Sequence, residues 1–171
     1  EWFDLINSCA EKGASLGMET WLYDEDRWPS GIAGGMVTKH RENRMKFLRM
    51  TVLESCEDTD RTDAVAVFAV NLDGLSFSGK ERISSGSQAG GRTVLKFTVE
   101  DREDSCNGYT YLDTMKREAT ECFIKETHEK YREHCGKHFG KEILGIFTDE
   151  PHRGAIMADF GNSNPDSEYL L

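Results

Sequence analysis

Residues 142–151, Glu-Ile-Leu-Gly-Ile-Phe-Thr-Asp-Glu-Pro, give the clearest indication of the architecture. The apolar run through Thr148 predicts a buried strand, which leads into Asp149 and Glu150. A second short strand is predicted at residues 109–112, and about 30 residues, the length of a βαβ unit, separate the two strands. We therefore expect these strands to lie parallel in one sheet, with a helix between them.

Two helices accompany the predicted strands. The first is predicted at residues 2–16, and a short strand at residues 18–23 follows it. The second is predicted at residues 114–135 and ends before Gly136. The expected buried positions are Trp2, Leu5, Ile6, Cys9 and Ala10 in the first helix, and Met115, Ala119, Cys122, Phe123, Thr127, Tyr131 and Cys135 in the second.

The middle of the chain has a different periodicity, because apolar and polar side chains alternate with a period of two. The runs that predict strands lie at residues 47–53, 65–70, 75–77 and 94–99. Polar breaks between these runs are typical of antiparallel hairpins. We therefore predict a β-rich insertion at residues 44–108, within an α/β segment formed by residues 1–43 and 109–171. Residues 154–171 are predicted as a long loop.

Length and charge restrict the class of protein. The 171 residues suit one compact domain with or without a small insertion, and a complete eight-stranded (β/α) barrel needs about 250 residues. The net charge is −10 and no basic stripe is present, so nucleic acid is not an expected partner. No run approaches the roughly 20 apolar residues of a membrane span, and we find no targeting segment. We expect a soluble, cytoplasmic protein that does not bind membranes.

The five cysteines include no Cys-x-x-Cys pair, so neither a disulfide framework nor a four-ligand zinc site is expected. We expect reduced thiols, with Cys9, Cys122 and Cys135 packed in the core. His134 and His138 have the spacing of metal ligands, but Gly136 lies between them, and we expect two surface histidines beside a helix end.

Acidic residues follow each of the three predicted parallel strands, because Tyr23 precedes Asp24, Glu25 and Asp26, Leu112 precedes Asp113, and Thr148 precedes Asp149 and Glu150. Ligands of parallel sheets bind outside the carboxyl ends of the strands, so these acids should share one rim. Glycoside hydrolysis needs such carboxyl groups, one to protonate the leaving oxygen and one to act as nucleophile or activate water. Trp21, Tyr23 and Trp28 would supply apolar surface for a sugar ring.

Each acid also has a structural interpretation. Asp113 stands where the N-cap of the 114–135 helix is expected. Asp24 or Asp26 can stabilise the turn at Trp28-Pro29, and Glu150 can be a solvated strand end. The Asp24–Asp26 group offers oxygen ligands for calcium without EF-hand spacing, and we expect no cofactor and no resident metal.

The glycine-rich stretch at residues 31–39 lacks the Gly-Lys-Ser/Thr order of a phosphate loop, so a turn is the favoured interpretation and nucleotide binding is an alternative. His152, two residues after Glu150, is placed to contact a ligand.

Three motifs carry a resemblance to a known family. They are Tyr23-Asp-Glu-Asp-Arg-Trp-Pro-Ser-Gly-Ile-Ala-Gly-Gly35, Phe123-Ile-Lys-Glu-Thr-His-Glu-Lys-Tyr131 and Gly145-Ile-Phe-Thr-Asp-Glu-Pro151. With them the chain resembles large, mostly uncharacterised bacterial glycoside hydrolases related to the α-L-rhamnosidase type. The resemblance covers residues 2–45 and 109–152, and such proteins have a catalytic (β/α) barrel with extra β-domains.

The resemblance implies roles for particular residues. Glu150 would be a catalytic carboxyl, with Asp149 beside it. Asp24, Glu25 and Trp28 would line the sugar site, and Asp113 would contact a hydroxyl. Only three or four barrel strands are present, so we expect a partial TIM-barrel-like segment that can be inactive alone, with open edges that favour self-association.

The sequence thus predicts a carbohydrate-binding α/β segment that acts by carboxylate acid/base chemistry. One alternative is a non-catalytic carbohydrate-binding or assembly module, in which Trp28 and Tyr23 stack on sugar. The other is a phosphate- or nucleotide-binding α/β protein that uses residues 31–35.

Overall fold

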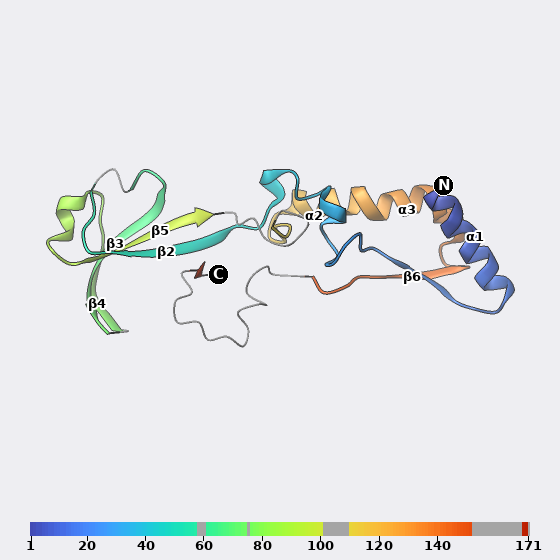
Figure 1. The fold of residues 1–171 in the computed structure, drawn as a ribbon, viewed down its shortest axis with the longest axis horizontal. Helices are drawn as coiled ribbons and strands as arrows, with labels where there is room; N and C mark the ends of the chain where they lie inside the picture. The colour runs from blue at the N-terminus through green and yellow to red at the C-terminus, as the bar shows by residue number, and fades with distance from the viewer. Residues whose placement is uncertain (58–60, 75, 101–109, 152–168, 171) are drawn as a thin grey trace. The chain divides into compact units, whose positions relative to one another are not determined.

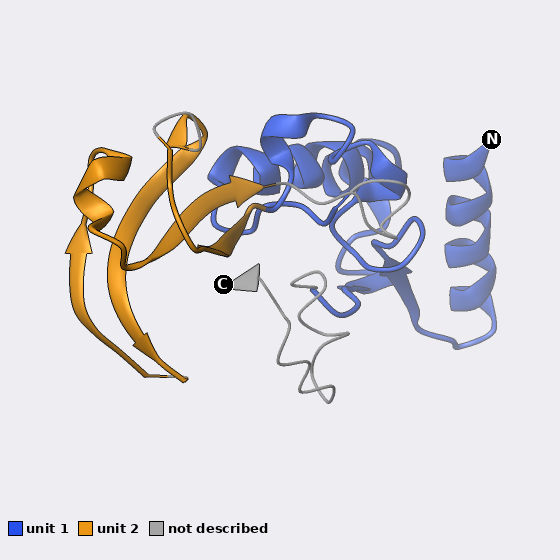
Figure 2. Cartoon of the chain, turned by 60° about the vertical axis from the view of Figure 1, so that its left-hand side comes forward, with its two compact units in different colours: residues 1–45, 103–162 blue, residues 46–102, 163–171 orange. Residues whose placement is uncertain are grey.

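The computed structural model describes residues 1–57, 61–74, 76–100, 110–151 and 169–170 (Figure 1). The chain forms two compact units, each made of two separate stretches (Figure 2). Unit 1 contains residues 1–45 and 103–162, and unit 2 contains residues 46–102 and 163–171. Helices and both parallel and antiparallel strands are present, which confirms the mixed α/β class. Among the described strands no closed barrel forms.

Unit 1 is built around two parallel strands, β1 (Thr20–Tyr23) and β6 (Ile143–Phe147). Three helices accompany them, namely α1 (Trp2–Ser15), α2 (Arg117–Phe123) and α3 (Glu129–Cys135). One core cluster of this unit, beside the helices, consists of Ala10, Leu22, Cys135 and Ile143, with half-buried side chains around them. Alternate residues of the strands therefore face the helices, because successive side chains of a strand point to opposite faces.

The prediction that residues 109–112 form the parallel partner of β6 was wrong. β6 pairs with β1, whereas Leu112 makes only an isolated antiparallel bridge to Arg44, and Tyr109 lies outside the described residues. The backbone around Leu112 is bonded to another segment: Met45 N–H donates to the Tyr111 carbonyl at 2.8 Å, and Asp113 N–H donates to the Asn43 carbonyl at 2.8 Å. The short apolar stretch is thus buried beside residues 43–45 instead of joining the sheet.

The predicted 114–135 helix begins later and contains a wide turn. It starts at Arg117, and Met115 is 92% exposed, so Met115 lies outside the buried stripe. The predicted N-cap at Asp113 is also wrong, since Lys116 occupies that position and the Asp113 carboxylate accepts the N–H of Met115 at 3.0 Å. Residues Ile124–His128 form a π turn between α2 and α3. Buried positions spaced four apart drift by about 40° per step in an α-helix, and the wider turn compensates for that drift.

The N-terminal helix buries a face that is rotated from the predicted one. Ala10 is buried and Phe3 and Ile6 pack beside it, but Trp2 and Leu5 are exposed. The Phe3 ring explains this orientation, because it stacks on His134 with centroids 4.3 Å apart and meets Tyr131 edge-on.

The burial predicted for the cysteines and for His138 also differs from the structure. Cys135 is buried, Cys122 is half-buried and Cys9 is exposed, because Cys9 lies outside the face of α1 that contains Phe3, Ile6 and Ala10. His138 was expected at the surface and is buried instead. The reason is its Nδ1 atom, which lies 2.9 Å from the Glu142 carboxylate, so the imidazole packs at the start of β6.

Unit 2 is a five-stranded antiparallel sheet, which confirms the hairpin pattern. Its strands are β2 (Phe47–Leu53), β3 (Ala64–Asp73), β4 (Ser76–Arg82), β5 (Thr93–Glu100) and β7 (Tyr169–Leu170), in the order β4-β3-β5-β2-β7. Its buried core is formed by Cys56, Val67, Ala69, Ile83, Ala89 and Val94. β7 corrects the prediction of a loop throughout residues 154–171, since it pairs with β2; the preceding residues lie outside the described part. Within the described residues, no helix is long and apolar enough to cross a bilayer.

Candidate functional site

The two parallel strands of unit 1 end together at one edge. Tyr23 and Phe147 form the last pair in the register, and Asp24 N–H then donates to the Phe147 carbonyl at 3.1 Å. The segment that starts at Asp24 and the segment that starts at Thr148 therefore leave the sheet side by side. This edge is the position at which open parallel sheets bind ligands.

The hydroxyl of Tyr23 joins acids from both segments. It bonds to the carboxylate of Asp149 and lies 2.9 Å from Oε2 of Glu25. These contacts raise the pKa of the Tyr23 phenol above its usual range, chiefly through Asp149, then through desolvation and the bond to Glu25. The phenol is therefore held in its neutral, hydrogen-bonding form between two carboxyl groups.

Asp24 is the buried acid of this edge. Its Oδ1 accepts the hydroxyl of Ser30 at 2.6 Å, and its Oδ2 lies 2.8 Å from both Nε2 of His128 and Oγ1 of Thr148. Its side chain has no exposed surface. Three protein groups thus solvate a carboxylate that would otherwise be costly to bury, and they occupy the oxygens that the sequence prediction assigned to a sugar.

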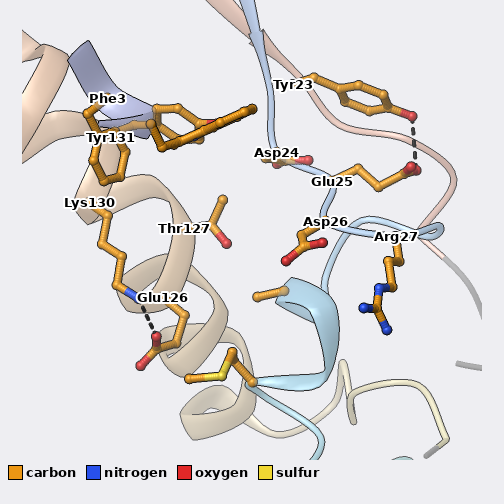
Figure 3. Close-up of a pocket in the computed structure, with 13 residues that line it drawn as sticks. Phe3, Tyr23, Asp24, Glu25, Asp26, Arg27, Glu126, Thr127, Lys130 and Tyr131 are labelled. Atoms are coloured by element: carbon orange, nitrogen blue, oxygen red, sulfur yellow. Dashed lines mark hydrogen bonds and ion pairs between the residues drawn. The ribbon is translucent and has the colours of Figure 1, made fainter. Parts of the chain in front are cut away.

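A pocket of about 500 Å³ opens beside these residues (Figure 3). Trp2, Phe3 and Tyr131 contribute its aromatic lining, and Glu25 and Asp26 contribute carboxylates. Glu126 also lines it, and its carboxylate lies 2.6 Å from the Lys130 ammonium group, which lowers the pKa of Glu126. Pockets of this size and composition suit a small ligand with an apolar face and several hydroxyl groups.

The structure brings together only some of the predicted site residues. Tyr23, Glu25 and Asp149 meet, as described, through the tyrosine hydroxyl. Glu150 is exposed and adopts a positive φ of 39°, a strained conformation for a residue with a side chain. The pocket lining does not include Asp149 or Glu150. It also leaves out Trp28, which is exposed, and Asp113, which holds the turn before α2. His152 lies outside the described residues.

Sequence reasoning missed several residues that the structure places here. Trp2 was assigned to the buried face of the first helix, and its spacing alone does not separate that role from a pocket lining. His128 lies within the second motif of the resemblance, but the π turn that directs it toward Asp24 has no signature in a helical periodicity.

The described residues offer little support for a calcium site at Asp24–Asp26 or for phosphate binding at residues 31–35. Among the residues that the structure describes, no group of three His, Cys, Asp or Glu side chains is arranged to hold a metal ion. In the glycine-rich stretch, Gly34 N–H donates to the Asp26 carbonyl at 2.8 Å, and Gly35 N–H donates to the Ile32 carbonyl at 3.0 Å. These amides are already bonded within the protein, whereas a phosphate loop points its amides at the ligand.

Comparison of the chain with protein-family models, with curated proteins and with solved structures finds no match.

Proposed function

We propose that this chain is a segment of a glycoside hydrolase whose sugar site lies at the carboxyl edge of β1 and β6. The observation that carries the proposal is the Tyr23 hydroxyl, which joins Glu25 and Asp149 beside an aromatic-lined pocket. Carboxyl groups supply the acid/base chemistry of glycosidic cleavage, and aromatic rings bind the apolar face of a sugar. The sequence resemblance agrees with this assignment.

Asp149 and Glu150 are the proposed catalytic carboxyls. One carboxylic acid protonates the oxygen that leaves, while a carboxylate removes a proton from the water that adds to the anomeric carbon, or attacks that carbon first. The strained backbone of Glu150 supports a functional role, because such conformations cluster at functional sites. Tyr23 and Glu25 would bind substrate hydroxyls and orient Asp149.

We further propose that unit 1 is part of a (β/α) barrel. Parallel sheets are normally covered on both faces, but β1 and β6 leave Trp21, Tyr23 and Phe147 exposed on the face opposite the helices. In a barrel, further strands and inward side chains cover that face. This exposed aromatic face supports the proposal of self-association.

A non-catalytic carbohydrate-binding module is the second candidate. It is favoured by the position of Glu150, which is exposed and outside the pocket lining, and by the bond that engages Asp149 with Tyr23. In this case the carboxylates and aromatic rings bind sugar without breaking it. Nucleotide binding has less support, because the amides of Gly34 and Gly35 are bonded within the protein.

A substitution series with p-nitrophenyl α-L-rhamnoside and methyl α-L-rhamnoside tests both candidates. We expect hydrolysis by the unmodified chain and a loss of about 100-fold or more in Asp149→Asn and Glu150→Gln, with Asp113→Asn as the matched carboxyl control. Hydrolysis that survives both substitutions contradicts the proposed catalytic roles. Binding of the methyl glycoside without hydrolysis supports the binding module, and neither binding nor hydrolysis contradicts both candidates for these sugars.

A further inference from the structure

A chain of hydrogen bonds connects the interior of unit 1 to the carboxyl edge. Asp24 is its centre, and its three partners come from different parts of the sequence: Ser30 from the loop after β1, His128 from the π turn, and Thr148 from the end of β6. A buried carboxylate with all donors in place is a rigid junction, since the loss of any donor leaves a charge poorly solvated.

Ser30 extends this junction to Asp149. Its hydroxyl donates to Asp24, and the hydroxyl oxygen accepts the N–H of Asp149 at 2.9 Å. The Ser30 N–H also donates to the Asp149 carbonyl at 3.2 Å. Asp149 is therefore fixed through both backbone groups, while its carboxylate bonds to Tyr23.

His128 closes the junction from the helix side. A carboxylate only accepts hydrogen bonds, so the Nε2 atom of His128 carries the proton that points at Asp24. The imidazole contacts the Phe123 ring, with centroids 5.1 Å apart, and its side chain is 31% exposed. The π turn is what places His128 at this point, because an added residue in one turn rotates the side chains that follow it.

We propose that His128 and Asp24 form a positioning pair that fixes the Asp149 carboxylate against the Tyr23 hydroxyl. Neither residue is assigned a contact with substrate. The catalytic value of the pair rests on the proposed function, but the positioning itself does not. In many enzymes, residues that do not contact the substrate hydrogen-bond to the reacting residues and fix their orientation in the same way.

The Tyr23 phenol provides a readout of this positioning that needs no sugar. Because Asp149 is the main cause of its raised pKa, any release of Asp149 lowers the pH at which Tyr23 ionises. We would incorporate 3-fluorotyrosine, which ionises at a lower pH than tyrosine, and follow each ring by ¹⁹F NMR during a pH titration. The Tyr23 signal is identified by its absence in Tyr23→Phe.

The expected result separates positioning from general stability. His128→Ala should lower the Tyr23 midpoint by about one pH unit, whereas His128→Gln, which keeps a donor at a similar place, should retain most of the shift. His138→Ala is the matched control, because His138 is a buried histidine that bonds to Glu142 at the opposite end of β6. It should leave the midpoint of Tyr23 unchanged.

Several outcomes would overturn the proposal. An unchanged Tyr23 midpoint in folded His128→Ala would do so, as would an equal shift in His138→Ala, which indicates general loosening. If His128→Ala does not fold, Ser30→Ala, which removes the hydroxyl that connects Asp24 to Asp149, must lower the midpoint of Tyr23 instead, and no change there contradicts the pair. Hydrolysis assays remain a separate measurement, so an inactive chain with the expected ¹⁹F shifts contradicts the proposed function and leaves the positioning pair supported.

Discussion

The indole ring of Trp21 lies over Gly145 on the neighbouring strand, at the place where any other residue would carry a β-carbon. A β-carbon at Gly145 would overlap the Cζ3 atom of Trp21. Trp21 is nevertheless 59% exposed, so the ring rests on the backbone of β6 without being enclosed. Beside it, Tyr23 and Phe147 meet edge-on with centroids 5.3 Å apart, and the three rings form one aromatic face of the sheet.

Gly145→Ala should displace the Trp21 ring and lower the free energy of unfolding by about 1 kcal/mol, since an exposed ring can move more easily than an enclosed one. The measurements are thermal unfolding and tryptophan emission, in a background where Trp2 and Trp28 are phenylalanine. Gly136→Ala is the control, because the nearest atom to its added β-carbon is 3.9 Å away. Unchanged emission in Gly145→Ala would contradict the stacked position of Trp21.

Stability should fall in acid through the contact between Glu142 and His138. The hydrogen bond from His138, followed by a backbone hydrogen bond, lowers the pKa of Glu142. A carboxyl with a lowered pKa in the folded state stabilises the protein above its unfolded pKa, and this contribution is lost as the pH falls through the folded pKa. Urea unfolding between pH 6 and about 3 should therefore depend less steeply on pH in Glu142→Gln. Glu118→Gln, which alters an exposed acid on α2, should behave as the unmodified chain.

Tyr23→Phe should weaken the sugar site without disturbing the ring packing against Phe147. It removes the hydroxyl that joins Glu25 and Asp149, so neither carboxylate is held in place for a sugar hydroxyl, and we expect roughly a tenfold loss of affinity. The loss should appear in the affinity for methyl α-L-rhamnoside measured by calorimetry. Tyr131→Phe, which changes another tyrosine of the pocket, serves as the control, and equal losses in both variants would argue against a special role for Tyr23.

The pocket should discriminate against acidic sugars. Its lining has four acids, Asp24, Glu25, Asp26 and Glu126, against two bases, Arg27 and Lys130. Glucose and glucosamine should therefore bind more tightly than glucuronate, and the difference should shrink at high salt and in Asp26→Asn. NMR titration of the three sugars would test this order, and tighter binding of glucuronate would show that the acids do not control the site.

The elements of this fold could be predicted from hydrophobic periodicity, but one strand pairing could not. β1, β6 and the strands β2, β3 and β5 of unit 2 occur close to their predicted positions, because alternating or continuous apolar runs have few other structures available. The partner of β6 depends on tertiary contacts. Residues 110–112 have strand-like composition, yet their backbone bonds to residues 43–45, and no local pattern distinguishes these two outcomes.

Only part of the candidate site could be predicted, because its other residues also depend on tertiary contacts. Tyr23, Glu25 and Asp149 meet because acids at the ends of adjacent parallel strands share an edge, which is a rule that sequence alone can use. Asp24 has the same position in sequence but turns inward, and only its three partners reveal that it is buried. The position of His128 depends on a single π turn, and the 3.6-residue periodicity used to predict helices does not reveal such a turn.

The division of the chain into units has a practical consequence for dissecting the protein. Each unit is assembled from two stretches that are far apart in sequence, since residues 46–102 interrupt unit 1 and β7 returns to β2. Neither unit can be produced by choosing one start and one stop codon. Isolating either would require joining its two stretches by a designed linker or a circular permutation, because any single continuous segment lacks part of one unit or includes part of the other.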